Sequence, residues 1–178
     1  MSCQKNYLAL SIPQCAIRRD GRAKDSGRRT PGSETERDTT MRFMILVKAT
    51  RDSEGGGKPP EELFALMADY HEQLVKAGVL LDASGLQPSS KGWRIKYSGG
   101  KRTVIDGPFT EAKELVAGYT IIQVKSREEA LEWTRRFPNP AIDGKECEIE
   151  VRQMFELEDF GESEAIDRFR EMGLATQK

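Results

Sequence analysis

Two side chains of this sequence have types and positions that suit proton transfer. His71 is the only histidine among the 178 residues, and histidine is the side chain whose ordinary pKa lies closest to neutrality. Asp106 lies at the end of a predicted strand, where a carboxylate can point into the mouth of a barrel. Partial desolvation by Phe109 and Tyr119 would suit this carboxylate to general-base catalysis. Asp106 and His71 are therefore the candidate catalytic residues, and Phe109 and Tyr119 are candidate ligand contacts.

Each catalytic candidate also has a purely structural alternative. The Asp106 carboxylate can accept the backbone N–H of Phe109 or Thr110 and so fix a turn. His71 lies at the edge of the apolar stripe of a predicted helix. It is either directed into a cavity between helix and sheet or an ordinary histidine at the core boundary. Both alternatives stay open at this point.

A third candidate lies on the last predicted strand. Arg152 shares a face with Glu148 and Glu150, because strand residues two apart point to the same side. Its guanidinium can clamp an anionic ligand. The alternative is a salt-bridge ladder between protomers or on an exposed edge. Four basic residues of a predicted hairpin are explained more simply as a charged edge that prevents strand addition: Arg94, Lys96, Lys101 and Arg102.

The cofactor and metal motifs that residue spacing can reveal are not found in this sequence. Three scattered cysteines and one histidine match neither a zinc site nor a disulfide framework. The run Gly55-Gly56-Gly57-Lys58 lacks the spacing of a phosphate-binding loop. We therefore expect no cofactor and no bound metal, and we expect Cys147 to be buried and inert.

Composition narrows the class of protein. Hydrophobic residues make up 37% and charged residues 32%, and 28 Lys+Arg against 29 Asp+Glu leave a net charge of −1. This balance argues against direct electrostatic binding of nucleic acid. No apolar run approaches the ~20 residues of a membrane helix. Unpaired thiols are typical of a reducing compartment, so we expect a cytoplasmic protein.

The chain divides into three parts. Residues 1–40 are poor in large apolar side chains from residue 18 onward, which predicts a disordered extension or a start that belongs at Met41. Residues 41–160 form the predicted domain. Residues 161–178 predict a weakly amphipathic C-terminal helical tail with three apolar positions, Ile166, Phe169 and Met172.

Hydrophobic periodicity predicts an α+β domain with the element order β-α-β-β-β-β-α-β. The pattern indicates strands near 43–49, 79–81, 93–97, 102–105, 117–124 and 148–153, and helices over 61–77 and 126–137. This order is the ferredoxin-like one with added strands, which places the helices on one face of an antiparallel sheet. Two strands are apolar on both faces, so the other face also needs a cover. A second copy of the sheet is the simplest cover, which predicts a homodimer.

The run from Gly99 to Trp133, GGKRTVIDGPFTEAKELVAGYTIIQVKSREEALEW, resembles the DGPF branch of the YCII-related family. The tetrapeptide of that branch is present as residues 106–109, and the resemblance covers about 41–161. It implies a dimeric α/β barrel of ferredoxin-like protomers. Some relatives are proposed enzymes that use a histidine and an aspartate, and members are often encoded near extracytoplasmic-function sigma factors. The family's histidine would lie near Met67, about one helical turn from His71.

Two functions of different classes follow. The first is a small cytosolic homodimer that binds a small molecule and catalyses a cofactor-independent, lyase- or isomerase-like proton transfer through Asp106 and His71. The alternative is a non-catalytic binding or regulatory module associated with an extracytoplasmic-function sigma factor. A scaffold that uses only its dimer interface is a third, plainer option. Asp106→Asn separates them, because it abolishes turnover only in the first.

Overall fold

The structure is a computed structural model that describes residues 40–110, 114–142 and 144–173. The predicted disordered extension at 1–40 therefore lies almost entirely outside the described residues. None of the described helices is long and apolar enough to cross a membrane.

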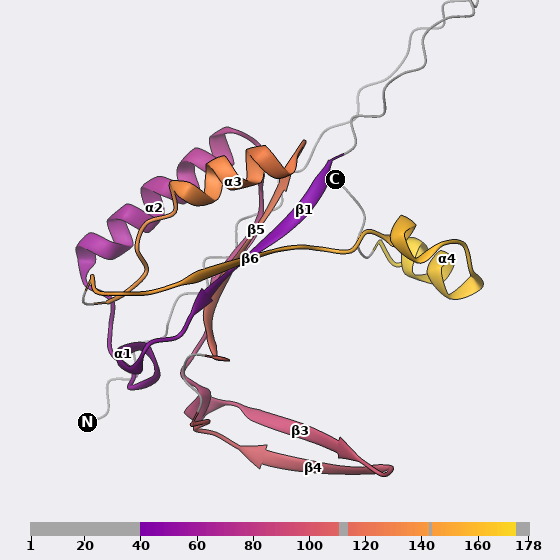
Figure 1. The fold of residues 1–178 in the computed structure, drawn as a ribbon, viewed down its shortest axis with the longest axis horizontal. Helices are drawn as coiled ribbons and strands as arrows, with labels where there is room; N and C mark the ends of the chain where they lie inside the picture. Colours follow the sequence, from indigo (N-terminus) through magenta and orange to yellow (C-terminus); the bar gives the residue numbers. More distant parts are fainter. Residues whose placement is uncertain (1–39, 111–113, 143, 174–178) are drawn as a thin grey trace, which may run out of the picture. The chain divides into compact units, whose positions relative to one another are not determined.

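The described residues form one four-stranded sheet, one two-stranded sheet and the helices around them (Figure 1). The strands are β1 (Met41–Lys48), β2 (Leu80–Gly85), β3 (Trp93–Ser98), β4 (Lys101–Asp106), β5 (Val116–Val124) and β6 (Ile149–Gln153). The helices are α1 (Arg51–Glu54), α2 (Glu61–Lys76), α3 (Arg127–Arg135) and α4 (Glu164–Glu171), with 3-10 turns η1 (Ser89–Lys91) and η3 (Leu157–Phe160).

The larger sheet has the strand order β2-β5-β1-β6, and each neighbouring pair is antiparallel. With α2 between β1 and β2 and α3 between β5 and β6, this arrangement is compatible with a ferredoxin-like fold. The hairpin β3–β4 is inserted between β2 and β5 and forms a sheet of its own. The prediction of an α+β protein is thus confirmed, and the predicted order of strands and helices is found with one addition between β1 and α2, the short helix α1.

Helix α2 follows from local signals. Pro59 and Pro60 precede its first turn, where Glu61 and Glu62 interact favourably with the helix dipole. The chain leaves the helix through Gly78, whose φ is 72°. The apolar residues at helical spacing on this segment predict a core-facing stripe that includes Leu66, Tyr70, Leu74 and Ala77. That stripe is only partly buried, because Tyr70 and Leu74 are buried whereas Leu66 and Ala77 are exposed.

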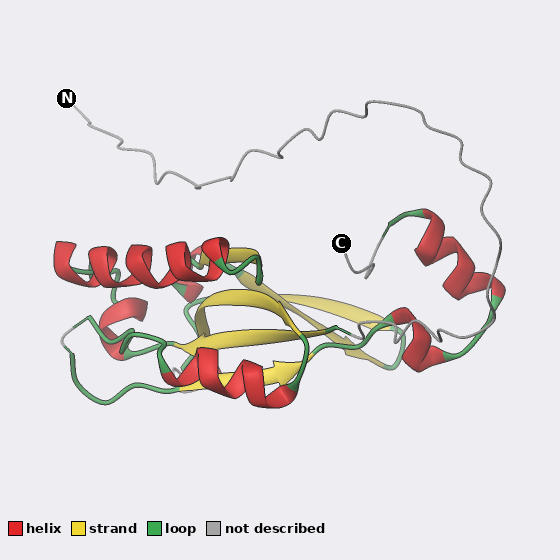
Figure 2. Ribbon diagram, turned by 90° about the horizontal axis from the view of Figure 1, so that it is seen from above, coloured by secondary structure: helices red, strands yellow, loops and turns green. Residues whose placement is uncertain are grey.

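The core lies between α2, α3 and one face of the larger sheet (Figure 2). Strand β1 contributes Phe43 and Ile45, and β5 contributes Ile122 and Val124. The helices contribute Tyr70, Leu74 and Ala130, and Val79 lies just before β2. Residues two apart on β1 and β5 therefore face the helices, as strand alternation requires.

The opposite face of the larger sheet, which α2 and α3 leave uncovered, is called the open face here. Its apolar residues are Met44 and Leu46 on β1 and Tyr119 and Ile121 on β5, and all four are half-buried. Charged residues surround them, namely Lys48, Asp82, Glu150 and Arg152. The open face is the surface that the sequence assigns to a second copy of the chain, and the homodimer stays a prediction.

A bidentate ion pair holds the chain beyond β6 against the start of β1. The Arg42 guanidinium donates from Nε to Glu156 Oε1 at 3.0 Å and from its terminal nitrogen to Oε2 at 2.8 Å. The same guanidinium donates to the carbonyl of Phe155 at 3.2 Å. Both charged side chains are almost fully buried. Such a pair costs desolvation on formation, and the loss of one partner leaves a buried charge uncompensated.

A second polar cluster ties the base of the β3–β4 hairpin to α1. The Glu54 carboxylate accepts hydrogen bonds from the backbone N–H and the hydroxyl of Ser89, and Ser89 Oγ accepts the N–H of Phe109 at 3.1 Å. A Cβ at Gly107 would collide with the Ser89 carbonyl oxygen, so this approach requires glycine. Thr50 and Ser53 cap the start of α1 reciprocally, each side chain accepting the backbone N–H of the other residue.

We expect Glu156→Gln to lower the free energy of unfolding by about 3 kcal/mol, because it leaves the Arg42 charge buried without its counter-ion. Urea denaturation measures this loss. The matched control is Glu158→Gln, an exposed neighbour, which should change stability by less than about 0.5 kcal/mol. Equal effects of the two substitutions would show that the ion pair does not hold this part of the chain.

The raised pKa of the buried Tyr70 phenol predicts a loss of stability at alkaline pH. Burial raises the pKa of this phenol from 10.0 to about 12, although the nearby Arg136 lowers it, and its hydroxyl donates to the Trp133 carbonyl at 3.1 Å. The folded state favours the neutral phenol, so its contribution is complete below pH 10 and is lost as the pH rises toward 12. We expect Tyr70→Phe to be less stable than the wild type by about 1 kcal/mol near pH 8.

That difference between wild type and Tyr70→Phe should shrink steadily as the pH rises above 10. Urea titrations across this range measure it. Tyr97→Phe, which alters an exposed phenol, is the control and should follow the wild type throughout. A constant difference between Tyr70→Phe and the wild type at all pH values would contradict this account.

Candidate functional site

A phenol and a carboxylate meet on the open face. The Tyr119 hydroxyl donates to Asp82 Oδ2 at 2.8 Å. The two residues come from adjacent strands, because β2 pairs with β5 so that Asp82 lies beside Ile121 and Ser84 beside Tyr119. The hydrogen bond to Asp82 is the main cause that raises the pKa of Tyr119, and desolvation and the carboxylate charge act in the same direction. The phenol therefore stays protonated while it points at a carboxylate acceptor.

A strip of charges runs beside this pair on β1 and β6. Glu150 bonds to Lys48 Nζ at 2.6 Å and lies 3.7 Å from Arg152 Nε. The hydrogen bond between Lys48 and Glu150 raises the pKa of the ammonium and lowers that of the carboxylate. Arg152 is largely exposed and turns toward Glu150 within its own chain. The structure thus shows a charged ladder within one protomer and leaves the guanidinium accessible to a ligand.

His71 lies on α2 against the helix-covered face of the sheet. Its Nδ1 is 2.7 Å from the Met67 carbonyl oxygen, and its Nε2 is 3.0 Å from Thr120 Oγ1. A carbonyl only accepts, so Nδ1 carries the proton that this hydrogen bond needs. In the neutral ring Nε2 is then the acceptor, and the Thr120 hydroxyl donates to it. Tyr70 lies edge-on to the imidazole, with the ring centroids 5.6 Å apart.

Strand alternation separates the two sets of polar groups. Tyr119 and Thr120 are consecutive on β5, so they point to opposite faces of the sheet. Tyr119 reaches Asp82 on the open face, and Thr120 reaches His71 under α2. The imidazole and the phenol–carboxylate pair of one protomer therefore belong to different sites.

The structure does not bring Asp106 into contact with His71. Asp106 ends β4 opposite Trp93, and its side chain is exposed. Within the described residues it makes no hydrogen bond or ion pair, and both ring nitrogens of His71 are bonded elsewhere. The N–H of Phe109 donates to Ser89 rather than to Asp106, so Ser89 takes the turn-fixing role considered for the carboxylate. The Phe109 ring stacks under the Arg94 guanidinium at 3.9 Å from its centroid.

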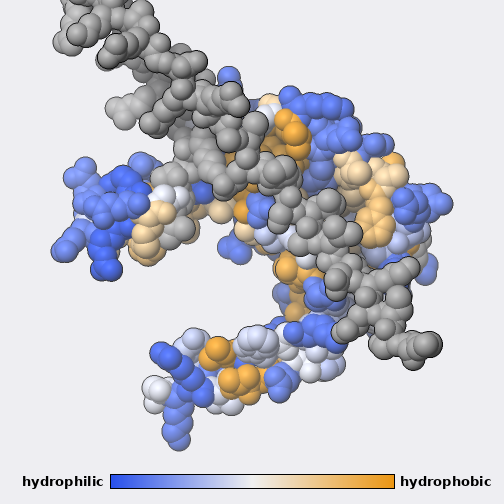
Figure 3. All heavy atoms as spheres, turned by 180° about the vertical axis from the view of Figure 1, so that it is seen from behind, coloured by the Kyte–Doolittle hydropathy of each residue, from blue (hydrophilic) through white to orange (hydrophobic). Residues whose placement is uncertain are grey.

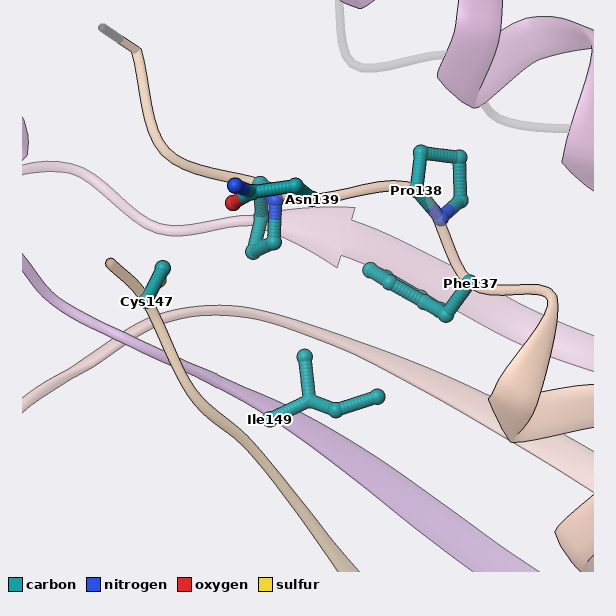
Figure 4. A pocket seen from close by; sticks show the side chains of 6 residues that line it. Phe137, Pro138, Asn139, Cys147 and Ile149 are labelled. Carbon is teal, nitrogen blue, oxygen red and sulfur yellow. The ribbon is translucent and has the colours of Figure 1, made fainter. Parts of the chain in front are cut away.

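A pocket of about 320 Å³ opens between the end of α3 and the start of β6 (Figure 4). It is lined by Phe137, Pro138, Asn139, Pro140, Cys147 and Ile149. The Asn139 amide is already bonded to the carbonyls of Gly144 and Lys145. Burial is the main cause that raises the pKa of the Cys147 thiol, so the thiol stays protonated near neutral pH and is a poor nucleophile. The prediction of an inert cysteine agrees with this environment, although Cys147 is only half-buried.

Sequence reasoning missed Asp82 as a site residue. Aspartate is depleted in strands, so its position directly after the apolar run Val79-Leu80-Leu81 was an available signal. Its partner could not be inferred locally, because the register of β2 against β5 shifts between Leu80 and Asp82. Among the described residues no group of three or more potential metal ligands comes together.

Two comparisons with known proteins bear on this fold and site. Residues 41–155 match the family described as the YCII-related domain. A segment of 79 residues is 32% identical to an uncharacterized protein of Rhizobium meliloti (strain 1021). That similarity covers 44% of this chain and 64% of the relative's length. The matched family region includes the larger sheet, the hairpin and both helices that cover the core.

The single histidine makes the Thr120 contact directly measurable. We expect nitrogen-15 NMR of the wild type above neutral pH to show the Nδ1–H tautomer, with Nε2 unprotonated and hydrogen-bonded. Thr120→Val should remove the hydrogen-bond shift at Nε2, whereas the matched Thr120→Ser keeps the hydroxyl and the shift. A wild-type spectrum of the Nε2–H tautomer would contradict the assigned orientation of the ring.

Proposed function

Because the chain belongs to the YCII-related family, we propose that it acts as a homodimer whose two open faces meet and enclose a small-molecule site. The supporting observation is that Met44, Leu46, Tyr119 and Ile121 place partly exposed apolar side chains at the centre of a sheet face that no helix of the described residues covers. A twofold axis across this face places the same residues of both protomers on the two walls of one space. This arrangement corresponds to a dimeric α/β barrel.

We propose that this site catalyses cofactor-independent proton transfer of the lyase or isomerase type. The hydrogen bond from Tyr119 to Asp82 carries this proposal, because it pairs a protonated phenol with a carboxylate on the face that dimerisation encloses. A substrate oxygen that takes the Tyr119 hydrogen bond leaves Asp82 without its donor. The carboxylate then removes a proton from the adjacent substrate carbon, and the phenol stabilises the oxyanion that develops.

Arg152 and Phe109 have supporting roles in this proposal. Arg152 is the exposed cation at the edge of the open face, where an anionic substrate group competes with Glu150 for its guanidinium. Phe109 lies under Arg94 at the hairpin base, three positions after Asp106, where it is a ligand contact if Asp106 is the base. Asp106, whose carboxylate makes no hydrogen bond or ion pair with the described residues, is the second candidate base. His71 lies on the other face of the sheet with both ring nitrogens bonded, so it takes no part in the open-face mechanism.

We also assign the chain to the DGPF branch of the family, on residues Asp106-Gly107-Pro108-Phe109. In this chain, the glycine of the tetrapeptide allows close contact with Ser89, and the phenylalanine N–H donates to the hydroxyl of the same serine. The non-catalytic alternative is a module that associates with an extracytoplasmic-function sigma factor. It is favoured if the protein accelerates deuterium exchange on none of the compounds described below.

Deuterium uptake in D2O, followed by proton NMR on a panel of small keto acids and lactones, tests the reaction class. We expect the wild type to accelerate exchange at an acidic C–H bond of at least one compound. Asp82→Asn should then reduce the rate by about a hundredfold or more, and Tyr119→Phe by roughly tenfold or more. Ser84→Ala, on the same face and strand as Asp82, is the control and should retain the wild-type rate.

The same panel discriminates among the candidate residues. If Asp106→Asn abolishes exchange while Asp82→Asn does not, the base is at the hairpin, and the open-face mechanism is wrong. Sedimentation velocity tests the dimer: Ile121→Lys puts a charge on the open face and should yield monomers. Leu131→Lys, at an exposed apolar position of α3, should leave the dimer intact.

A further inference from the structure

One row of side chains crosses the open face from edge to edge, with opposite charges at its two ends. Asp82 on β2 is paired with Ile121 on β5. Met44 on β1 is paired with Ile121 on one side and with Arg152 of β6 on the other. Directly opposed residues of an antiparallel pair share one face of the sheet. The row therefore has a carboxylate at the β2 edge, two apolar side chains in the middle and a guanidinium at the β6 edge.

The two charged ends of the row are not placed to hold one small molecule within a chain. Asp82 and Arg152 are separated by three strand spacings of about 4.8 Å each, roughly 14 Å in the sheet. Arg152 Nε lies 3.7 Å from Glu150 Oε1, so the guanidinium turns along its own strand and not across the sheet. The Asp82 carboxylate accepts the Tyr119 hydroxyl and the N–H of Ala83, and it makes no ion pair with the described residues. The base of the proposed mechanism thus has no cation beside it in the described part of its own chain.

Twofold symmetry limits which residues of a second copy can face Asp82 across the open face. With the axis parallel to the strands, the row lies across from the same row of the partner with its two ends exchanged. Asp82 then faces the partner's Arg152 at both ends, and the apolar centres face each other. With the axis parallel to the row, the two β2 strands meet, and two Asp82 carboxylates share an edge where neither β2 nor β5 contains a cation. Charge complementarity therefore favours the axis parallel to the strands.

The neighbouring row on the same face agrees with this orientation. It consists of four residues that are paired across the sheet in the order Ser84, Tyr119, Leu46 and Glu150. The same axis brings the hydroxyl groups at its β2 side toward the partner's Glu150, whose carboxylate accepts hydrogen bonds. Both rows are thus complementary to themselves in one and the same arrangement of the two chains.

The exposed apolar face of the hairpin β3–β4 has no comparable pattern. Figure 3 shows hydrophobic side chains between hydrophilic ones along the hairpin. The apolar face carries one cation, Arg102, and one carboxylate, Asp106, whereas Arg94, Lys96 and Lys101 lie on the other face. The charges of that face therefore identify no partner, whereas those of the open face stand at opposite ends of one row.

We propose that each site of the homodimer is built from both chains, with Asp82 and Tyr119 from one protomer and the partner's Arg152 as the group that binds a substrate carboxylate. This inference rests on the proposed function and adds to it the source of the anion-binding group and the class of ligand, small keto acids. Packed sheets lie about 10 Å apart, so the partner's Arg152 extends over Asp82 with room for a small molecule between them.

The arrangement assigns one group of the substrate to each side chain. The guanidinium of the partner's Arg152 binds the carboxylate, and the Tyr119 hydroxyl binds the carbonyl oxygen. The C–H bond next to the carbonyl breaks, its proton passes to the Asp82 carboxylate, and its electron pair moves onto the carbonyl oxygen to give an enolate. Return of a proton from Asp82 to carbon completes the exchange, and no oxidant or reductant is needed.

Cross-linking tests the orientation of the two chains without any substrate. Cys3, Cys15 and Cys147 are first replaced by serine. Ser84→Cys and Glu150→Cys, from opposite ends of the second row, are then introduced into separate chains, one of which carries a tag that changes its size. After subunit exchange, a short bismaleimide should join the two kinds of chain and give at least about tenfold less product with either variant alone.

Three results would overturn the two-chain site. Joining of Ser84→Cys chains to one another, without joining in the mixture, would show that the β2 strands meet. Equal product in every combination would show that the thiols react without a fixed orientation, and no product in any combination would show that the open faces do not meet. Leu131→Cys, at an exposed position of α3, is the matched control and should join neither variant.

Mixing two impaired variants tests whether the groups act together across the interface. Asp82→Asn and Arg152→Gln should each lower the exchange rate on a dilute keto acid. In a mixed dimer, one of the two sites keeps both Asp82 and the partner's Arg152, so an equimolar mixture after subunit exchange should recover about a quarter of the wild-type rate. Asp82→Asn with Tyr119→Phe is the matched control and should stay at the mean of the two parents, because both groups come from the same chain.

The choice of substrate separates a ligand-binding arginine from a salt bridge between the chains. Arg152→Gln should raise KM for keto acids at least about tenfold and leave KM for lactones, which have no carboxylate, unchanged. An equal change of KM for both kinds of compound would show that Arg152 acts only on the dimer, and the proposed role would be wrong.

The outcomes also separate this inference from the proposed function. If the mixed chains cross-link and no compound of the panel exchanges, the orientation of the two chains stands and the proton-transfer reaction is wrong. If exchange occurs and the mixture of Asp82→Asn with Arg152→Gln recovers none of it, the reaction stands and the two-chain site is wrong. A wild-type monomer at all concentrations overturns both.

Discussion

The pairing of β5 with β1 in one register determines which side chains can act together. Ile45 lies opposite Thr120, and Leu46 lies opposite Tyr119. Ile45 and Ile122 are fully buried under the helices, so a shift by one residue would expose the core and bury the open-face residues. The same register places the Tyr119 phenol on the open face and the Thr120 hydroxyl under His71. Burial of apolar side chains thus sets the chemistry of both faces, although none of the buried residues takes part in it.

Two polar contacts between residues far apart in the sequence position the segments that lie outside the larger sheet. Arg42 and Glu156 are 114 positions apart, and Glu54 and Ser89 are 35 apart. The first contact fixes where the chain goes after β6, and the second fixes where the hairpin leaves the domain. The segments that these contacts anchor, residues 155–172 and the hairpin, also carry most of the exposed aromatic surface outside the sheet. The position of each segment therefore depends on a polar contact to a residue far away in the sequence.

The sequence predicted the elements whose signals are local and missed those that depend on distant partners. Helix α2 was predictable from the prolines before it and the glycine after it. The turn between β3 and β4 was predictable from Gly99-Gly100, because both residues have the positive φ that a tight hairpin turn requires. Helix α1 was missed because four residues show no periodicity, and its position depends on the Glu54–Ser89 contact. Asp82 was missed as a partner of Tyr119 because their meeting depends on an irregular register between strands. His71 was placed at the helix edge as expected, but its bond to Thr120 required the sheet.

Gly107 fixes the point from which the hairpin projects. The Ser89 carbonyl lies so close to this residue that a side chain has no room, and the Gly107 N–H also donates to the Gly92 carbonyl at 3.0 Å. The base of the hairpin is therefore held in place by tight packing and a backbone hydrogen bond, and it is not a free hinge. Its reach is set by strand length, at roughly 3.3 Å for each added residue pair. Lengthening or shortening the two strands together would therefore change how far the hairpin projects, while its base stays in the same place.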